Sequence, residues 1–182
     1  MAKTVCIIAG ARPNFVKVSP LVRAINKNPE ANCLLVYAGS ENDPTLEPSL
    51  FEDLQMPRPQ YYLGVDSTSL NEITSQVMAR FDAFLDEHAV DVVIVVDDLA
   101  STMAAAIVTK KRGIRLAHLV AGTRSFNINM PKEINRLVID ALSDYLFTAG
   151  VKSIQALILF KERDSSTTTP SGNSTPSPYM ET

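Results

Sequence analysis

The stretch of residues 92–120, VVIVVDDLASTMAAAIVTKKRGIRLAHLV, predicts how the rest of the chain folds. It begins with residues 92–96, which are apolar on both faces, as a central strand of a parallel sheet is. An alanine-rich helix is expected over residues 101–112, ended by Gly113, and a second strand over residues 115–120. Two strands joined by a helix of this length form a βαβ unit, so the two strands run parallel.

The same alternation extends in both directions along the chain. Strands are expected over residues 4–9, 33–37 and 145–148, and helices over residues 14–27, 45–54, 69–88 and 131–142. The connection QMPRPQYYLGV, residues 55–65, is broken by prolines and is expected to be irregular. The pattern predicts an α/β fold, a parallel sheet wound right-handedly with helices on both faces.

Length and composition suggest one such domain. The chain has 182 residues, of which 46% are hydrophobic, and a domain of this size buries a core without disulfides or metals. We expect an α/β domain over residues 1–150 and a helix over residues 151–163. The remaining segment, 164–182, is rich in Ser, Thr and Pro and is expected to be disordered.

Composition also excludes several classes of function. The formal net charge of −3 and the pI near 5.4 do not supply the basic face that nucleic-acid binding needs. No run approaches the roughly 20 apolar residues of a membrane-spanning helix, and the N-terminal apolar run is too short for a signal peptide. The two cysteines, Cys6 and Cys33, do not suggest a disulfide framework. We expect a cytoplasmic protein that binds neither nucleic acid nor membranes.

Four strand ends mark where a ligand is expected, because ligands of open parallel sheets lie beyond the carboxyl ends of the strands. These ends are residues 10–13, 38–41, 97–98 and 121–124. At the first of them, Arg12 precedes a helix and Lys17 lies one turn inside it, where backbone amides already favour anions. Arginine adds planar, bidentate donors for phosphate or carboxylate. The sequence therefore predicts a crevice for a small anionic ligand.

Each of these features also has a purely structural interpretation. Residues 10–13 match no dinucleotide or Walker motif and fit a tight strand-to-helix turn as well as an anion site. Asp97 and Asp98 more often cap a helix than hold a metal, so we expect neither a metal nor a cofactor. His118 lies in an apolar run and is expected to be packed and hydrogen-bonded rather than catalytic. Glu133 fits a helix-dipole partner as well as a catalytic acid.

Three segments together resemble the non-hydrolysing UDP-N-acetylglucosamine 2-epimerases. They are GARPNFVKVSPL (10–21), LASTMAAAIVTKKRGIRLAHLVAGTRSF (99–126) and MPKEINRLVIDALSDYLFT (130–148). The likeness runs in order over about residues 4–150, and although each motif alone is modest, their joint occurrence is specific. The resemblance implies a Rossmann-like sheet that forms the N-terminal half of a glycosyltransferase-B-like enzyme, with substrate bound between two such halves.

The reaction that the resemblance implies is the interconversion of UDP-GlcNAc and UDP-ManNAc. Such enzymes eliminate UDP to give a glycal intermediate and then add UDP back with inverted configuration at C2. This chemistry needs acid/base groups near C2 and cations for the leaving diphosphate. The implied ligand is a UDP-sugar, bound weakly or not at all by this chain alone. The implied assembly is a homodimer or a complex with a partner chain that supplies the second domain.

Carried over position by position, the resemblance assigns two catalytic and five substrate-binding residues. Asp98 matches the aspartate of Gly-Asp-x-x-Ser-Thr, and Glu133 matches the glutamate of Pro-x-Glu-x-Asn-Arg; these are the implied catalytic residues. The implied substrate-binding residues are Arg12, Lys17, Arg124, Asn135 and Arg136.

The same crevice departs from the family pattern. The catalytic glutamate of His-x-Glu-Ala-Gly is Val120 here, and an apolar side chain cannot transfer a proton. Losing such a group typically slows a reaction by about 10²–10⁴-fold. Asp97 replaces a glycine, and Ala100 replaces an asparagine. In the family's Thr-Gly-Gln-His loop, Ser40 and Glu41 replace the last two residues, and Glu41 adds a carboxylate that repels diphosphate.

The family pattern stops near residue 150, before the second domain that supplies much of the nucleotide site and a catalytic histidine. Three interpretations remain open. The chain is an epimerase-like N-terminal domain that is inactive alone, a pseudo-enzyme that acts as a binding or interaction module, or one half of a split glycosyltransferase-B enzyme. A truncation or a frame-changed gene would give the same sequence.

Overall fold

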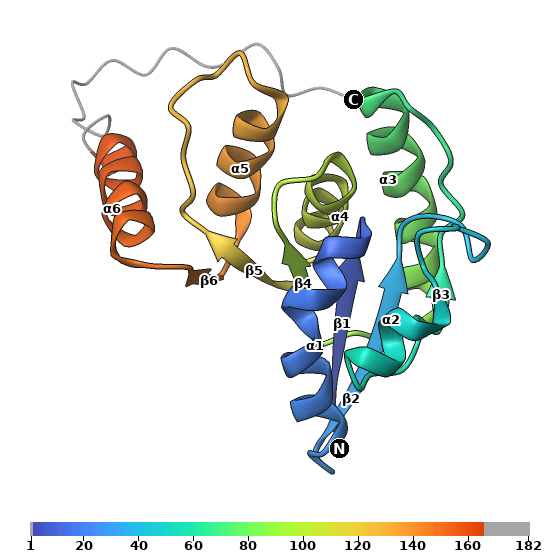
Figure 1. Cartoon of the computed structure of the whole chain (residues 1–182). Helices are drawn as coiled ribbons and strands as arrows, with labels where there is room; N and C mark the ends of the chain where they lie inside the picture. The colour runs from blue at the N-terminus through green and yellow to red at the C-terminus, as the bar shows by residue number, and fades with distance from the viewer. Residues whose placement is uncertain (1, 166–182) are drawn as a thin grey trace.

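A computed structural model describes residues 2–165, in which six strands form one parallel sheet (Figure 1). The strands are β1 (Lys3–Ala9), β2 (Ala31–Tyr37), β3 (Tyr61–Tyr62), β4 (Val92–Val96), β5 (Arg115–Ala121) and β6 (Tyr145–Thr148). They lie in the order β3-β2-β1-β4-β5-β6, and every neighbouring pair is parallel. This is the strand order of a Rossmann-like sheet, so the predicted α/β fold is confirmed.

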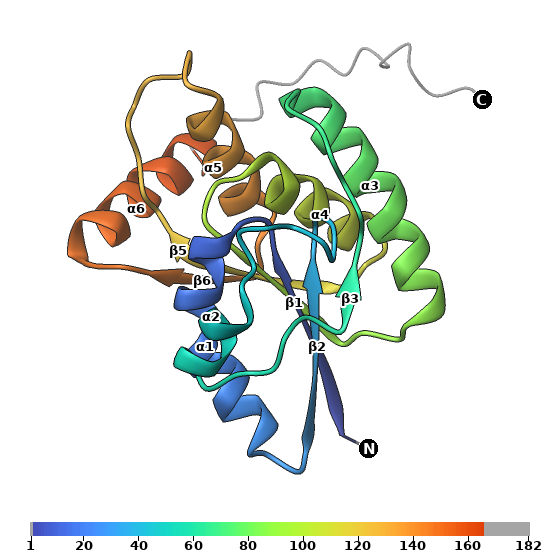
Figure 2. The same ribbon diagram turned by 45° about the vertical axis from the view of Figure 1, so that its right-hand side comes forward.

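Helices cover both faces of the sheet (Figures 1 and 2). One face carries α1 (Arg12–Asn26) and α2 (Pro48–Asp53). The other carries α3 (Leu70–Glu87), α4 (Ala100–Lys111) and α5 (Pro131–Leu142). The last helix, α6 (Val151–Ser165), follows β6. The predicted tail of residues 164–182 lies, apart from its first two residues, outside the described part of the chain.

Alternation along the central strands divides the core into two layers. In β1, Ile7 and Ala9 pack with residues of α1 and α2, whereas Cys6 and Ile8 pack with residues of α3 and α4. Successive side chains of a strand point to opposite faces, so a strand that is apolar at every position fills both layers. This is why the continuous apolar runs in the sequence become β1 and β4, the two central strands.

The predicted elements differ from the observed ones mainly at the β2 edge of the sheet. Residues 55–65 were expected to be irregular, yet Tyr61 and Tyr62 form β3, which pairs with Val36 and Tyr37 of β2. A strand of two residues is too short for its alternation to be visible in a sequence. The helix expected over residues 45–54 shortens to α2, because Pro48 occupies its first turn and sets its start.

No helix within residues 2–165 is long and apolar enough to cross a lipid bilayer. The longest, α3, has charged residues on its exposed face and buries Val77, Phe81, Phe84 and Leu85 in the core.

Candidate functional site

The point where the chain changes direction across the sheet lies between β1 and β4. From β1 the chain runs outward through β2 and β3, and from β4 it runs outward the other way through β5 and β6. Helices leaving two such neighbouring strands on opposite faces leave a hollow at the strand ends. A hollow of about 400 Å³, here called the β1–β4 crevice, lies there, lined by Ala11, Pro13, Asn14, Lys17, Asp97, Asp98, Leu99, His118, Val120, Thr123, Lys132 and Arg136.

At the end of β4, Asp97 is held against α1. Its carboxylate forms an ion pair with Lys17 and accepts a hydrogen bond from Nδ2 of Asn14 at 2.8 Å. Oδ1 of Asn14 in turn accepts from the backbone amides of Gly10 and Ala11 at 2.8 and 3.1 Å. Asn14 therefore joins the turn after β1 to the turn after β4. The ammonium group of Lys17 is already paired with the Asp97 carboxylate, so an anionic ligand has to compete for it.

The next residue, Asp98, pairs with α5. Nη2 of Arg136 lies 2.5 Å from Oδ2 of Asp98, and Nη1 of the same guanidinium lies 3.1 Å from Oε2 of Glu133. Nδ2 of Asn135 donates to the backbone carbonyl of Asp98 at 2.8 Å. Three of the residues that the family resemblance assigned, Asp98, Asn135 and Arg136, are thus brought together from β4 and α5.

Glu133 lies behind Arg136 and is only 2% exposed. Its Oε2 accepts from the amide and the hydroxyl of Ser125, both at 2.9 Å, and its Oε1 accepts from the amide of Phe126 at 3.3 Å. Burial alone raises the pKa of the Glu133 carboxyl, but the hydrogen bonds from Ser125, Arg136 and Phe126 outweigh burial and hold that pKa below its ordinary value. In this arrangement Glu133 is an ionised anchor for the loop that follows β5.

A buried ionic cluster lies beneath the crevice. Oδ1 of Asp140 in α5 lies 2.6 Å from Nδ1 of His118 in β5, and Oδ2 of Asp140 lies 2.6 Å from Nη1 of Arg124. Oδ2 of Asp140 also accepts from the amide of Gly122 at 3.0 Å. Burial raises the pKa of the Asp140 carboxyl, but the hydrogen bonds and charges of His118 and Arg124 outweigh burial and keep that pKa below its ordinary value.

Left-handed backbone occurs directly after β4, at Asp97, and near the end of β5, at Val120, where the pairing of β5 with β6 is irregular. Asp97 has φ of 62° and Val120 has φ of 68°. A non-glycine residue in this region costs of order 1–3 kcal/mol, and the cost is greatest for a β-branched side chain such as valine. The position that the family resemblance gives to a catalytic glutamate therefore holds a residue that fits its backbone poorly and presents only hydrocarbon to the crevice.

The structure distributes the seven predicted site residues over three environments. Lys17, Asp98 and Arg136 line the β1–β4 crevice, and Asn135 binds the backbone beside it. Arg12 is the exposed first residue of α1. Glu133 and the side chain of Arg124 are buried, in the contacts given above.

Sequence reasoning missed three residues of the site. Asn14 and Lys132 line the crevice, and Asp140 lies beneath it. A signal existed for two of them. Asn14 is the third residue of α1, a position from which a side-chain oxygen can accept from the backbone amide that precedes the helix. Asp140 lies seven residues, or two helical turns, after Glu133 and so on the same face of α5. Lys132 is an exposed lysine that no pattern singles out.

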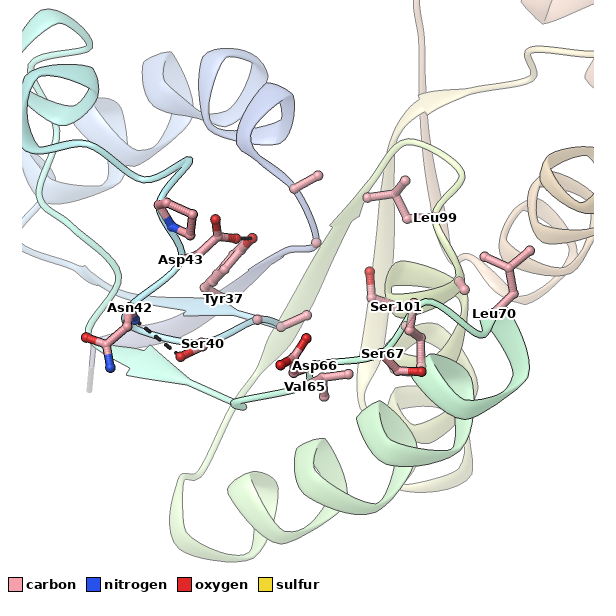
Figure 3. Close-up of a pocket in the computed structure, with 17 residues that line it drawn as sticks. Tyr37, Ser40, Asn42, Asp43, Val65, Asp66, Ser67, Leu70, Leu99 and Ser101 are labelled. Carbon is pink, nitrogen blue, oxygen red and sulfur yellow. Dashed lines mark hydrogen bonds between the residues drawn. The ribbon is translucent and has the colours of Figure 1, made fainter.

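A second hollow of about 620 Å³, here called the β2-side pocket, lies at the ends of β1 and β2 (Figure 3). Its polar lining comes from the loop after β2, the segment before α3 and the start of α4: Tyr37, Ser40, Asn42, Asp43, Asp66, Ser67 and Ser101. None of the described residues that line it is a lysine or an arginine. Its charges are the carboxylates of Asp43 and Asp66, and exposed Glu41 lies beside the lining residues Ser40 and Asn42.

The two hollows share a wall formed by Ala11 and Leu99. The wall is close-packed, because a Cβ atom added to Gly10 would meet Oγ of Ser101 at 2.1 Å and Cδ1 of Leu99 at 2.9 Å. Only glycine lets the end of β1 approach the start of α4 so closely. Within residues 2–165, no group of three or more His, Cys, Asp or Glu side chains gathers as a metal site.

The strand order and the crevice at its reversal point define a Rossmann-like α/β domain whose ligand site lies between β1 and β4. Comparison with known proteins narrows this class. The sequence model of a family described as UDP-N-acetylglucosamine 2-epimerase matches residues 23–169. The chain belongs to this family.

Individual relatives and solved structures support the same family assignment. The chain is 36% identical over 141 residues to UDP-N-acetylglucosamine 2-epimerase of Methanocaldococcus jannaschii, and the match covers 78% of this chain and 38% of that protein. It is 34% identical over 140 residues to UDP-2,3-diacetamido-2,3-dideoxy-D-glucuronate 2-epimerase of Pseudomonas aeruginosa, covering 77% and 40%. The crystal structure of the M. jannaschii enzyme with UDP-GlcNAc and UDP superposes with a TM-score of 0.80 at 33% identity, covering 86% of this chain and 43% of that one.

These coverages also show how much of each relative the chain matches. The chain spans about two fifths of the length of the relatives that it matches. It is an epimerase-like domain that corresponds to the N-terminal part of those proteins, with the fold of the N-terminal domain of a glycosyltransferase-B-like enzyme.

Proposed function

We propose that this chain is the N-terminal wall of a nucleotide-sugar site, that the β1–β4 crevice faces the UDP-sugar, and that the chain alone does not epimerise it. The proposal rests on one observation above all: the crevice of a 2-epimerase family member carries three cations, Lys17, Lys132 and Arg136, but Val120 where the family resemblance has its proton-transferring glutamate.

The cations suit a diphosphate. Lys17 and Lys132 approach the crevice from α1 and α5, and Arg136 adds a planar guanidinium whose donors match phosphate oxygens. Two of the three are already neutralised, because Lys17 pairs with Asp97 and Arg136 pairs with Asp98. We therefore expect weak binding of UDP by the isolated chain, with Lys132 contributing the free positive charge and the other two competing with their acids.

Catalysis by the chain alone is not expected, for two reasons. A glycal mechanism needs a group that removes and returns a proton at C2. Val120 has no such group, and Glu133 is an ionised acceptor committed to Ser125 and Arg136. The match covers only about two fifths of the relatives' length, so we expect the second wall of their site to lie outside the matched region. Asp98 and Glu133 as catalytic residues, and Arg12 and Arg124 as substrate contacts, remain proposals from family position.

Two measurements on the purified chain test this function. Calorimetric titration with UDP and with UDP-GlcNAc should give weak binding, and a chromatographic assay should detect no UDP-ManNAc above the buffer blank. Lys132→Gln should weaken UDP binding by about three- to tenfold, the range expected for one charge-assisted contact at an exposed site. Lys111→Gln is the matched control, because Lys111 is the last residue of α4 and the crevice lies at the first end of that helix. This substitution should leave the UDP affinity unchanged. Sustained UDP-ManNAc formation would overturn the proposed inactivity, and equal effects of the two substitutions would overturn the crevice assignment.

A second candidate is one half of a split enzyme whose other half is a separate polypeptide. It applies if another polypeptide supplies the part of the relatives that lies outside the match, about three fifths of their length. If a co-purifying chain restores UDP-ManNAc formation, the split enzyme is the correct function. If the chain binds UDP but gains no activity from any co-purifying protein, it is a binding module. For both candidates we propose a cytoplasmic location and, as a further assembly, a homodimer.

A further inference from the structure

His118, Asp140 and Arg124 form a buried cluster of polar and charged side chains. The contacts of the crevice described above give this cluster no role. The exposed fractions of the three side chains are 1%, 0% and 3%. Nε2 of His118 donates to the backbone carbonyl of Asp97 at 2.9 Å, while Nδ1 faces the Asp140 carboxylate at 2.6 Å. Both partners of the ring are acceptors, so the two contacts are hydrogen bonds together only when both ring nitrogens carry a proton. Burying these charges is costly unless they are paired, and here they are.

The cluster connects the two turns that form the floor of the crevice. Through His118, the Asp140 carboxylate holds the carbonyl of Asp97 at the end of β4. Directly, the same carboxylate accepts from the amide of Gly122 at the end of β5. One side chain on α5 is thus bonded, directly or through one ring, to the ends of two neighbouring strands.

Each of these two strand ends contains a strained residue. Asp97 and Val120 have left-handed backbones that their side chains disfavour, and such conformations persist only where the surroundings enforce them. The bonds from His118 and Asp140 fall on the carbonyl of Asp97 itself and on the amide two residues after Val120. Asp97, Asp98 and Val120 lie at these two strand ends and line the crevice.

We propose that Asp140 is a positioning residue of the β1–β4 crevice: it holds His118 with both ring nitrogens protonated and so fixes the two strand-end turns that place the crevice side chains. Asp140 touches no ligand, because it lies beneath the floor. The proposal rests on the proposed function in one respect only, that a UDP-type anion binds in this crevice.

Nuclear magnetic resonance of the histidine rings tests the first part on the unmodified chain. The sequence contains two histidines, so His88 is an internal reference. His88 lies in a different setting, with its Nδ1 2.9 Å from the carbonyl of Phe84 and its ring stacked on Phe84. At neutral pH, ring ¹⁵N shifts of His118 should be those of an imidazolium with two N–H groups. A neutral His118 in the folded, unmodified chain overturns the proposal, whether or not any variant folds.

Substitution tests the second part with a matched control. Asp144 anchors the opposite end of β5, through Lys110 at 2.8 Å and the amide of Leu116 at 2.7 Å. Asp140→Asn should convert His118 to a single-proton ring, shift the backbone amide signals of Asp98 and Gly122, and weaken UDP binding by about tenfold. Asp144→Asn should leave the His118 ring and the UDP affinity as they are.

His118→Gln is a second variant in case Asp140→Asn does not fold. It removes the bond to Asp97 while the contacts of Asp140 with Arg124 and Gly122 remain, so the Asp98 amide signal should move and the Gly122 signal should not. Unchanged amide signals in both variants overturn the positioning role. Absence of UDP binding by the unmodified chain overturns the proposed function alone, because the ring and amide signals still decide the role of Asp140.

Discussion

The two hollows at the carboxyl edge of the sheet differ in size and in charge. Size favours the β2-side pocket as the ligand site, whereas charge favours the β1–β4 crevice for an anionic ligand. The β2-side pocket is larger, about 620 Å³ against about 400 Å³, but its charged lining is Asp43 and Asp66. The β1–β4 crevice is smaller and carries three cations, one from α1 and two from α5, beside the carboxylates of Asp97 and Asp98. For an anionic ligand, charge decides over volume, because a hollow whose described charges are all carboxylates repels a diphosphate at any size.

The hollows also differ in how they are built. Two of the residues that line the β1–β4 crevice, Asp97 and Val120, have left-handed backbones, and buried or half-buried ion pairs surround them. None of the described lining residues of the β2-side pocket has positive φ, and its central contact is one hydrogen bond of 2.5 Å from the hydroxyl of Tyr37 to Asp43. Strain and paired charge concentrate where we propose function, as they do in many binding sites.

The largest expected effect is on the stability of the crevice. Arg136→Met leaves Asp98 and Glu133 without their shared cation, and breaking a buried or half-buried pair in this way costs about 3 kcal/mol. Asp66→Asn in the β2-side pocket removes an exposed charge and should change the free energy of unfolding by less than about 0.5 kcal/mol. Denaturant unfolding measures both. Similar losses in the two variants would mean that the hollows do not differ as described.

The next effect concerns backbone strain. Val95 and Val120 are both valines at a strand end, but Val95 is fully buried with an ordinary backbone. Val95→Gly should cost about 3–4 kcal/mol through the lost side chain and the flexibility of glycine. Val120→Gly should cost at least about 2 kcal/mol less, because relief of the left-handed strain offsets the lost packing. Equal unfolding free energies for the two variants would show that the backbone at Val120 stores no strain.

A smaller effect is expected on affinity. Asp97→Gly removes the carboxylate that competes for Lys17 and places glycine in a left-handed turn, so UDP affinity measured by calorimetry should rise about tenfold, or about 1.4 kcal/mol. Lys17→Gln in the same background should abolish the gain. Glu41→Gln, at an exposed position beside the other pocket, should raise affinity by no more than about twofold, because solvent screens its charge. The reverse ranking would place the anion near the β2-side pocket.

The smallest effect lies in that pocket and depends on pH. Burial raises the pKa of Asp43, but the hydrogen bonds from Tyr37 and Thr45 outweigh burial, so that pKa is lowered from 3.8. A carboxylate with a lowered pKa stabilises the fold above its unfolded value and loses this contribution as pH falls through its folded value. Tyr37→Phe should therefore cost about 1 kcal/mol at neutral pH. The difference should shrink below pH 3.8. A difference that stays constant to pH 2 would contradict this origin.

The fold was largely predictable because its strongest signals are local. The structure has β4 over Val92–Val96, α5 over Pro131–Leu142 and β6 over Tyr145–Thr148, the predicted ranges. Each is an apolar or amphipathic run with a clear start and end, so neighbouring residues suffice to define it. Strand β3 was missed because a two-residue strand exists only through its pairing with β2.

The location of the candidate site was predictable, but which of its charged side chains pair with one another was not. Strand ends predicted where the crevice would form, and the crevice does lie at the ends of β1, β4 and β5. No local pattern says that Asp97 pairs with Lys17, 80 residues away, or that Asp140 bridges His118 and Arg124. These pairs depend on which helix covers which strand. The expectation that His118 is packed and hydrogen-bonded agrees with its 1% exposure and two bonds.

The sequence by itself determined the order of strands and helices, the apolar layers and the family, because all three are written in the types and spacing of neighbouring residues. Only the tertiary structure decided which charges meet. An ion pair is a matter of a few ångströms between atoms far apart in the chain, and Coulomb energy in a buried setting changes steeply over that distance. The three cations and two carboxylates that line the crevice would make a different site if α5 were shifted by one turn.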